Sequence, residues 1–311
     1  MEMYKKENRY FYRAFGLNIA SDIYLPELMK LECKDECEGD VNIYLDRVPE
    51  EVSESISDNE YFKISKNELL FNVDGVAKYY IVNGKTIIVE PDTQANNNSV
   101  KLFILGSALG VLLIQRDIIP IHGSAVVING KCVVFTGASG AGKSTISSAL
   151  RKMGHVFLAD DISAVTFNEE GIPLVQPAYP QQKLWSDSLE VMGVDSNKLL
   201  KVYDDDEDKY AVKVDKGYSS GPVPISAIFE LSQEECTGVE VKQILGIDKL
   251  NSLLKNIYRV EYLKTLGIWP DYFKKCLNVS KDTKFFKLIR PAGIFSIEDQ
   301  VRLIKEKVEC L

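Results

Sequence analysis

The sequence predicts an α/β protein with two domains, a smaller strand-rich α+β domain over residues 1–98 and a larger P-loop domain over residues 99–311. Three observations support this prediction. The chain has 311 residues, which is more than one hydrophobic core usually organises. Its first hundred residues alternate short apolar runs with turns, a pattern typical of strands. Beyond them, an apolar run, a glycine-rich loop and a helical pattern follow one another, which is the order that a P-loop requires.

The N-terminal region contains several runs with the composition of β-strands. Asn83-Gly84, between the last two, is a strong signal for a hairpin turn. The polar stretch at residues 92–99 interrupts all periodicity, so we expect a linker and the domain boundary there. The expected strands are Asp40–Leu45, Tyr61–Ser65, Glu68–Val73, Ala77–Val82 and Lys85–Pro91.

The second region begins with the most apolar run of the chain, Leu102–Ile114, which we interpret as a buried helix because its 13 residues are too few to cross a bilayer. A hairpin turning at Gly130 should follow, and its second strand should lead into the glycine-rich loop. The expected strands are Ser124–Asn129, Lys131–Gly137, His155–Ala159, Ile162–Phe167 and Phe285–Ile289. The expected helices are Lys143–Met153 with a glycine cap at Gly154, Asp248–Tyr258, and Ser296–Val308 with a Ser-x-x-Asp capping pattern.

Composition and charge exclude several classes of protein. A hydrophobic share of 45% and a charged share of 26% are those of an ordinary soluble globular protein. The net charge of −8 argues against a nucleic-acid partner, because such proteins carry an excess of Lys and Arg. The six cysteines are scattered and the N-terminus lacks the apolar core of a signal peptide, so we expect the cytoplasm and no membrane partner. The Cys33 and Cys37 pair lacks further ligands at zinc-site spacing.

The stretch Gly137-Ala-Ser-Gly-Ala-Gly-Lys-Ser has the P-loop spacing and lies between an apolar strand and a helix. Glycines allow the backbone to curl so that N–H groups point at phosphate oxygens, and the helix N-terminus favours an anion. We therefore expect ATP and Mg²⁺ as cofactors, with Lys143 on the β and γ phosphates and Ser144 on the metal. The alternative is a glycine-rich turn without a ligand. The expected nucleotide-binding residues are Gly137, Ser139, Gly140, Ala141, Gly142, Lys143, Ser144 and Thr145.

Two carboxylates, Asp160 and Asp161, close an apolar strand directly after the P-loop helix. Nucleotide-hydrolysing and kinase folds keep the carboxylate that positions Mg²⁺ at such a place. The second carboxylate could accept the proton of an attacking hydroxyl. A solvated turn is the alternative interpretation.

Both histidines flank the P-loop unit. His122 could lie at the mouth of the site as a partner of the acidic pair, or within the core, whereas we expect a structural role for His155. The acidic run Asp204–Asp208 is expected to be a solvated loop.

The order His122-Gly123, GASGAGKST and GHVFLADD resembles the catalytic core of the HPr kinase/phosphorylase family. The stretches Tyr12–Leu28 and Asp40–Pro49 are similar to smaller relatives, the lasso peptide kinases, which phosphorylate the C-terminal serine of a precursor peptide. Thr145 departs from the glutamate usual in the HPr kinases, and their glycine- and arginine-rich signature is missing downstream.

The resemblance implies an HPr kinase-like P-loop domain with a mixed β-sheet, and transfer of the γ-phosphoryl group of MgATP to a serine hydroxyl of a precursor peptide. His122, Asp160 and Asp161 would be catalytic. Asp160 would accept the hydroxyl proton with the help of His122, and Asp161 would hold Mg²⁺ with Ser144, although the reverse assignment of the two carboxylates stays open. Lys183 and Arg259 are further candidates for substrate binding. Two other functions remain possible: a kinase of a small metabolite or free amino acid, and a non-catalytic ATP-binding regulator of peptide maturation.

Overall fold

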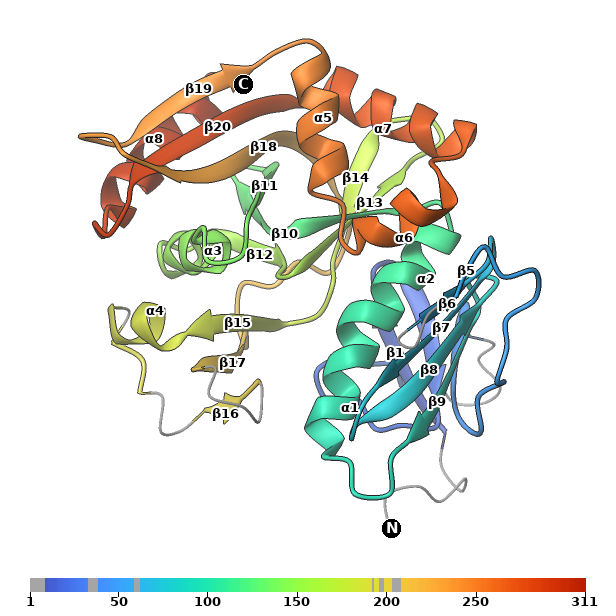
Figure 1. Cartoon of the computed structure of the whole chain (residues 1–311). Coiled ribbons are helices and arrows are strands. Elements are labelled where there is room, and N and C mark those ends of the chain that lie inside the picture. Colours follow the sequence, from blue (N-terminus) through green and yellow to red (C-terminus); the bar gives the residue numbers. More distant parts are fainter. Residues whose placement is uncertain (1–8, 33–38, 59–61, 192, 196–198, 203–207) are drawn as a thin grey trace.

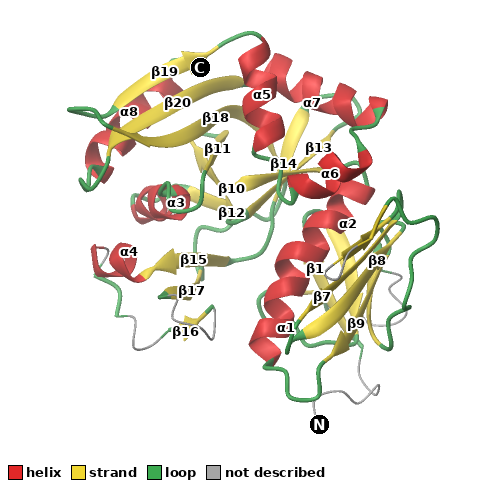
Figure 2. Ribbon diagram, viewed as in Figure 1, coloured by secondary structure: helices red, strands yellow, loops and turns green. Residues whose placement is uncertain are grey.

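The computed structural model describes residues 9–32, 39–58, 62–191, 193–195, 199–202 and 208–311 and has a mixed α/β fold (Figure 1 and Figure 2). The expected α/β class and the mixed sheet are confirmed. The pair Cys33 and Cys37 and the acidic residues Asp204–Glu207 lie outside the described residues. Asp208 is described, and its exposed carboxylate pairs with Lys201 at 2.8 Å.

The N-terminal region forms a nine-stranded sheet with the order β3-β1-β2-β4-β9-β8-β7-β6-β5. The pairs β2–β4 and β4–β9 are parallel, and the remaining pairs are antiparallel. Asn83 and Gly84 both have a positive φ, so the predicted hairpin turn between β8 and β9 is confirmed. The strands are β1 (Tyr10–Ala14), β2 (Leu17–Ser21), β3 (Met29–Lys30), β4 (Val41–Leu45), β5 (Ser57–Asp58), β6 (Phe62–Ile64), β7 (Glu68–Val73), β8 (Ala77–Val82) and β9 (Thr86–Pro91).

The predicted linker at 92–99 is wrong over its last residues, because helix α1 (Asn97–Phe103) begins there. The side chain of Asn96 accepts a hydrogen bond from the backbone N–H of Asn98 at 2.9 Å, which makes this asparagine a helix cap. The helix continues through a π-helical turn, η1 (Ile104–Ala108), into α2 (Leu109–Gln115). Residues 97–115 have the length and hydropathy of a membrane-spanning helix, but Ile104 to Ile114 are buried within this structure, as in the core helix of a soluble protein.

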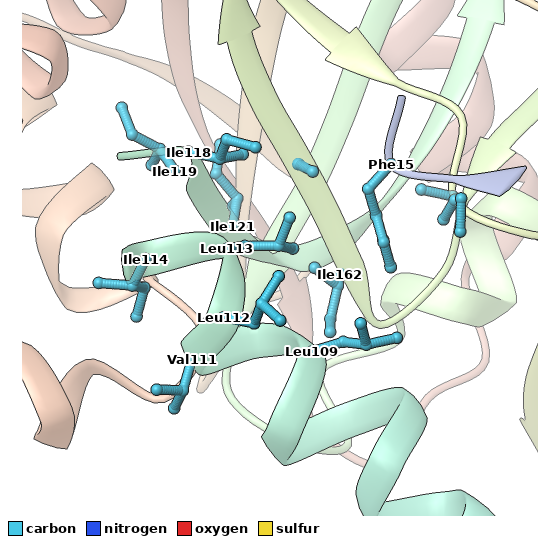
Figure 3. Close-up of a cluster of buried hydrophobic side chains, with 14 of the residues drawn as sticks. Phe15, Leu109, Val111, Leu112, Leu113, Ile114, Ile118, Ile119, Ile121 and Ile162 are labelled. Carbon is cyan, nitrogen blue, oxygen red and sulfur yellow. The ribbon is translucent and has the colours of Figure 1, made fainter. Parts of the chain in front are cut away.

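One hydrophobic cluster crosses the expected domain boundary (Figure 3). Leu109, Leu112 and Leu113 of α2 lie in this cluster with Phe15, in the turn between β1 and β2, and with Ile121 of the second sheet. The helix also contacts β8, so it packs on the N-terminal sheet although it follows residue 98. The two regions therefore share a continuous core at this helix.

The second sheet carries the P-loop. Its order is β11-β10-β13-β14-β18-β20-β19, β12 pairs with β10, and β11 also pairs with β18, which closes a ring of strands. β11, β18 and β20 run parallel, and the other neighbours are antiparallel. The strands are β10 (Ile119–Ile128), β11 (Lys131–Gly137), β12 (Val156–Ala159), β13 (Ile162–Phe167), β14 (Pro173–Gln176), β18 (Val223–Glu234), β19 (Glu240–Ile244) and β20 (Lys284–Pro291).

Helices cover both faces of this sheet. α3 (Lys143–Lys152) and α8 (Ile297–Glu309) pack on one face with the alternate residues Ala227, Phe229 and Leu231 of β18. α5 (Ile247–Lys255), α6 (Val260–Leu266) and α7 (Pro270–Asp282) lie on the other face. The predicted side-chain cap of α8 is wrong: the Ser296 hydroxyl makes no capping bond and instead accepts a hydrogen bond from the side-chain amide of Gln300 at 3.1 Å.

A small three-stranded sheet lies beside α3. Its strands are β15 (Gln181–Trp185), β17 (Lys209–Lys213) and β16 (Leu200–Lys201), and α4 (Ser186–Val191) follows β15 along the chain.

β10 begins at Ile119, earlier than the predicted Ser124, and changes its partner halfway along. Its first residues, up to His122, pair with β13, whereas its residues from Gly123 onward pair with β11. A Cβ atom on Gly123 would overlap the backbone carbonyl oxygen of Phe135 in β11. The glycine after His122 therefore allows two strands to approach closely where the histidine enters the site.

Replacing Gly123 by alanine should lower the free energy of unfolding by about 2–3 kcal/mol, because the carbonyl of Phe135 is held in the strand ladder and cannot move aside. Urea denaturation of this variant and of Gly221→Ala measures the effect. Gly221 is the matched control, since its Cβ position has no neighbour within 4 Å. Equal stability of the two variants would contradict the close approach.

Candidate active site

The P-loop lies between β11 and α3 and has the backbone that its glycines permit. Gly137, Gly140 and Gly142 have φ angles of 131°, 77° and 105°, which disfavour any residue with a Cβ. Gly137 also lies against β18, where a Cβ would be 2.5 Å from the carbonyl oxygen of Leu231. α3 begins immediately after Gly142, so its free N–H groups face the loop. This arrangement suits a phosphate group.

Lys143 folds its side chain back over the loop. Its Nζ donates hydrogen bonds to the carbonyl oxygens of Gly137 and Ala138 at 2.9 and 3.0 Å. Burial lowers the pKa of the Lys143 ammonium, while the carboxylates of Asp161 and Asp160 partly offset the shift. The lysine therefore places a positive charge at the centre of the loop, within reach of bound phosphates.

Asp160 contacts the P-loop serine. Its Oδ1 accepts hydrogen bonds from the hydroxyls of Ser124 at 2.6 Å and Ser144 at 2.9 Å, and its Oδ2 accepts from the backbone N–H of Lys183 at 2.8 Å. The side chain is buried. Asp160 is thus fixed beneath the N-terminus of α3, beside the residue that would bind a phosphate-bound metal.

Asp161 turns in another direction because its φ of 67° lies in the left-handed region. Its Oδ2 accepts from the Nζ of Lys183 at 3.0 Å, and its Oδ1 lies 3.5 Å from the Nδ1 of His122. Burial alone would raise the pKa of this carboxyl, but Lys183 and then His122 hold it well below its usual range. These two neighbours therefore favour the charged carboxylate of Asp161.

His122 is held by its backbone. Its N–H donates to the carbonyl of Asn256 at 2.7 Å, and its own carbonyl accepts from the Thr136 hydroxyl at 2.8 Å. Burial, and then the charge of Lys143, lower the pKa of the imidazole, so the ring is neutral near pH 7. Its Nδ1 makes no hydrogen bond to any described residue. The geometry places a neutral histidine beside Asp161.

These groups meet at a cavity of about 510 Å³. The cavity brings together most of the residues predicted from the sequence, namely His122, Ser139, Gly140, Gly142, Lys143, Ser144, Thr145, Asp160, Asp161 and Lys183. Gly137 and Ala141 shape the loop from behind without lining the cavity.

The structure corrects the interpretation of two residues. Arg259 does not line the cavity: it lies at the start of α6, with its guanidinium 5.2 Å from the ring centre of Tyr258. Lys183 lines the cavity, but its ammonium is engaged by Asp161. Although burial alone would lower it, Asp161 holds the pKa of Lys183 above its usual range. Lys183 is therefore a partner of the catalytic carboxylate candidate and not a free cation for a substrate.

The predicted metal pair, Ser144 with Asp161, is also revised. The Ser144 hydroxyl donates to Asp160, whereas Asp161 faces Lys183 and His122. Among the residues that the structure describes, no cluster of three or more metal-ligating side chains occurs. Ser144 and Asp160 fit Mg²⁺ nonetheless, because this ion commonly takes one or two protein oxygens together with the phosphates of a nucleotide.

Several cavity residues carried no recognisable signal in the sequence. Arg290 is one of them, and it comes from the far end of β20. Trp185 and Lys209 face each other across β15 and β17, with the ammonium 5.4 Å from the ring centre. Only the pairing of distant strands brings them to the P-loop.

Of the comparisons with known proteins, the one with solved structures found similar chains. No protein-family model matches the chain, and no curated protein matches it. Among solved structures, the Hpr(Ser) kinase/phosphatase from Coxiella burnetii is similar over 61% of this chain and 88% of that chain, at 15% sequence identity and a TM-score of 0.30. Because this TM-score is low, the function proposed below rests on the geometry of the site and on the sequence motifs.

Proposed function

We propose that this chain is an ATP-dependent phosphotransferase that moves the γ-phosphoryl group to a serine hydroxyl. One observation carries the proposal: the cavity that contains the P-loop also contains two carboxylates with different partners. Asp160 is bound to the P-loop serine, and Asp161 is turned toward His122. A carboxylate beside a histidine in the same cavity as a phosphate-binding loop is a candidate general base for an acceptor hydroxyl.

The residues present fit a magnesium-bound nucleotide. When bound, Mg²⁺ would neutralise charge on the β and γ phosphates. Gly140 leaves open the space that a Cβ would occupy, and the loop amides lie at the start of α3. Ser144 and Asp160 would hold the metal, and Lys143 would exchange its two loop carbonyls for phosphate oxygens.

On the acceptor side, Asp161 would orient the hydroxyl and accept its proton. Its low pKa makes it a weak base, which is sufficient when the transition state is loose and proton transfer is late. Lys183 fixes one carboxylate oxygen at 3.0 Å, so the other oxygen is directed at the acceptor. The neutral His122, 3.5 Å from that oxygen, would position the hydroxyl.

For the acceptor we propose the C-terminal serine of a precursor peptide. The support is the resemblance of His122-Gly123, the P-loop and the double aspartate, together with the N-terminal stretches, to lasso peptide kinases.

The test is incubation of the protein with Mg²⁺ and γ-labelled ATP in the presence of a lasso-type precursor ending in serine, with the same peptide ending in alanine as its control. Label should appear on the serine peptide only, because the hydroxyl is the nucleophile. Label on both peptides would move the acceptor to another residue. Label on free serine but on neither peptide would make the chain a small-molecule kinase. ATP binding without transfer to any acceptor would leave a binding module.

A further inference from the structure

We propose that the nucleoside part of the nucleotide binds against the loop between β20 and α8 and in the hollow between α3 and α8, with Phe295 as the platform for the base. This inference rests on the proposed function, since it presupposes a nucleotide in the P-loop. It assigns purine binding to residues that lie outside the P-loop and the other sequence motifs.

The two ends of the cavity differ in chemistry. At one end, His122, Asp161 and Lys183 lie near Trp185 of β15. At the other end, the cavity is lined by Arg290 and by Gly293, Phe295 and Gln300, which belong to the loop after β20 and to α8. α3 contacts both α8 and β15, and it lies between them in Figure 1.

In-line transfer places the attacking oxygen and the leaving oxygen on opposite sides of the transferred phosphoryl group. Since Asp161 and His122 define the acceptor side, the rest of the nucleotide must extend away from them. That direction leads to the carboxyl ends of the parallel strands β11, β18 and β20, where open α/β sheets commonly bind their ligands.

The cavity continues beyond the loop. A second hollow of about 580 Å³ lies between α3 and α8, and Phe295 and Ile297 line both spaces. Ala149, Met153 and Val301 give the second hollow an apolar wall, and charged side chains such as Lys152 and Glu298 stand around it. An apolar space with a few polar groups beside it suits a purine ring.

The apolar side chains here are exposed. Met153 and Phe295 are each 55% exposed and Ile294 is 58% exposed. Three such residues beside a phosphate-binding loop leave apolar surface in water, and a flat base stacked on Phe295 would cover it.

Arg290 adds a cation to the wall of the first cavity, beside the P-loop. Its Nε donates to the carbonyl of Ala141 at 3.3 Å, and the position of a Cβ on Gly142 would be 3.9 Å from its guanidinium. With its amide in the favourable orientation, Gln233 accepts from the terminal nitrogens of Arg290. These partners are neutral, and no ion pair between a described carboxylate and this guanidinium is found, so its charge remains available to phosphates nearest the nucleoside.

The experiment measures the dissociation constants of Mg-ATP and of inorganic tripolyphosphate by calorimetry. Phe295→Ala should weaken ATP about tenfold and leave tripolyphosphate within about twofold, because only ATP carries a base to stack. Arg290→Ala should weaken both ligands. Phe273→Ala, which removes a similarly exposed ring (39%) on α7, is the matched control and should change neither.

The outcomes distinguish a failure of the proposed base site from a failure of the proposed phosphotransferase function. Unchanged ATP affinity in Phe295→Ala, or a selective loss of ATP affinity in Trp185→Ala instead, would overturn the proposed base site while leaving the phosphotransferase proposal intact. If the wild-type protein bound neither ligand, the nucleotide-dependent function would fail, and this inference with it.

Discussion

Replacing Lys143 by alanine should reduce phosphoryl transfer by about 10³-fold or more, because it removes the ammonium that lies in the P-loop and offsets charge developing on the phosphates. The fold should survive. Ala138 is exposed, so water can replace the ammonium at its carbonyl, and only the carbonyl of the buried Gly137 loses its donor; the loss of stability should therefore be about 1–2 kcal/mol. Single-turnover transfer and thermal melting, measured on the same preparation, separate the two effects.

Lys284→Ala is the matched control, since Lys284 is an exposed lysine at the opposite end of β20 from Arg290. It should transfer at the wild-type rate. Wild-type turnover of Lys143→Ala, with an unchanged melting curve, would refute the assignment of this loop to phosphate binding.

Asparagine at Asp160 or at Asp161 should slow the chemical step by about 10²- to 10⁴-fold, but for different reasons. Asp160→Asn removes the charged oxygen that contacts Ser144, so metal binding weakens and raised Mg²⁺ should restore part of the rate. Asp161→Asn removes the group that accepts the hydroxyl proton, and added metal cannot replace it. A magnesium titration of single-turnover transfer distinguishes the two variants.

Asp215→Asn provides the control for a change of charge alone, because this carboxylate is 74% exposed and pairs with the exposed Lys213. Removing His122 should cost less than removing Asp161, and the double variant should lose less than the product of the two single effects, since the residues act together. Rescue of Asp161→Asn by magnesium, with no rescue of Asp160→Asn, would return the roles to those expected from the sequence.

The sequence was sufficient for the P-loop and its immediate neighbours because their chemistry is local. The spacing from Gly137 to Ser144 determines the loop, and the aspartates follow one helix and one strand later. What the sequence could not determine is which aspartate contacts the P-loop serine Ser144. Adjacent residues point in different directions according to their backbone angles, and the left-handed φ of Asp161 decides the matter here.

Strand pairings between residues far apart in the chain could not be predicted from the sequence. β18 pairs with β11 and β20 across large sequence separations, and it was not predicted, although it forms the centre of the second sheet. The same pairing brings Arg290 to the P-loop. Strands β1 and β2 were missed as well, and the asparagine-rich stretch interpreted as a linker turned out to cap a helix at Asn96. Polar composition alone does not distinguish a linker from a helix start.

The pairing of β10 with two strands limits how far the parts of the site can move relative to one another. It is bonded to the strand that leads into the P-loop and to the strand that follows Asp161, and the N–H of Gly123 donates to the Asp161 carbonyl at 3.1 Å. Sliding of β10 relative to either neighbouring strand would break the hydrogen bonds between them. The P-loop, His122 and Asp161 are therefore held together as one unit by backbone hydrogen bonds. In the proposed phosphotransferase, the adjustments made during a catalytic cycle would fall to side-chain rotations, such as that of Lys143 leaving its two carbonyls.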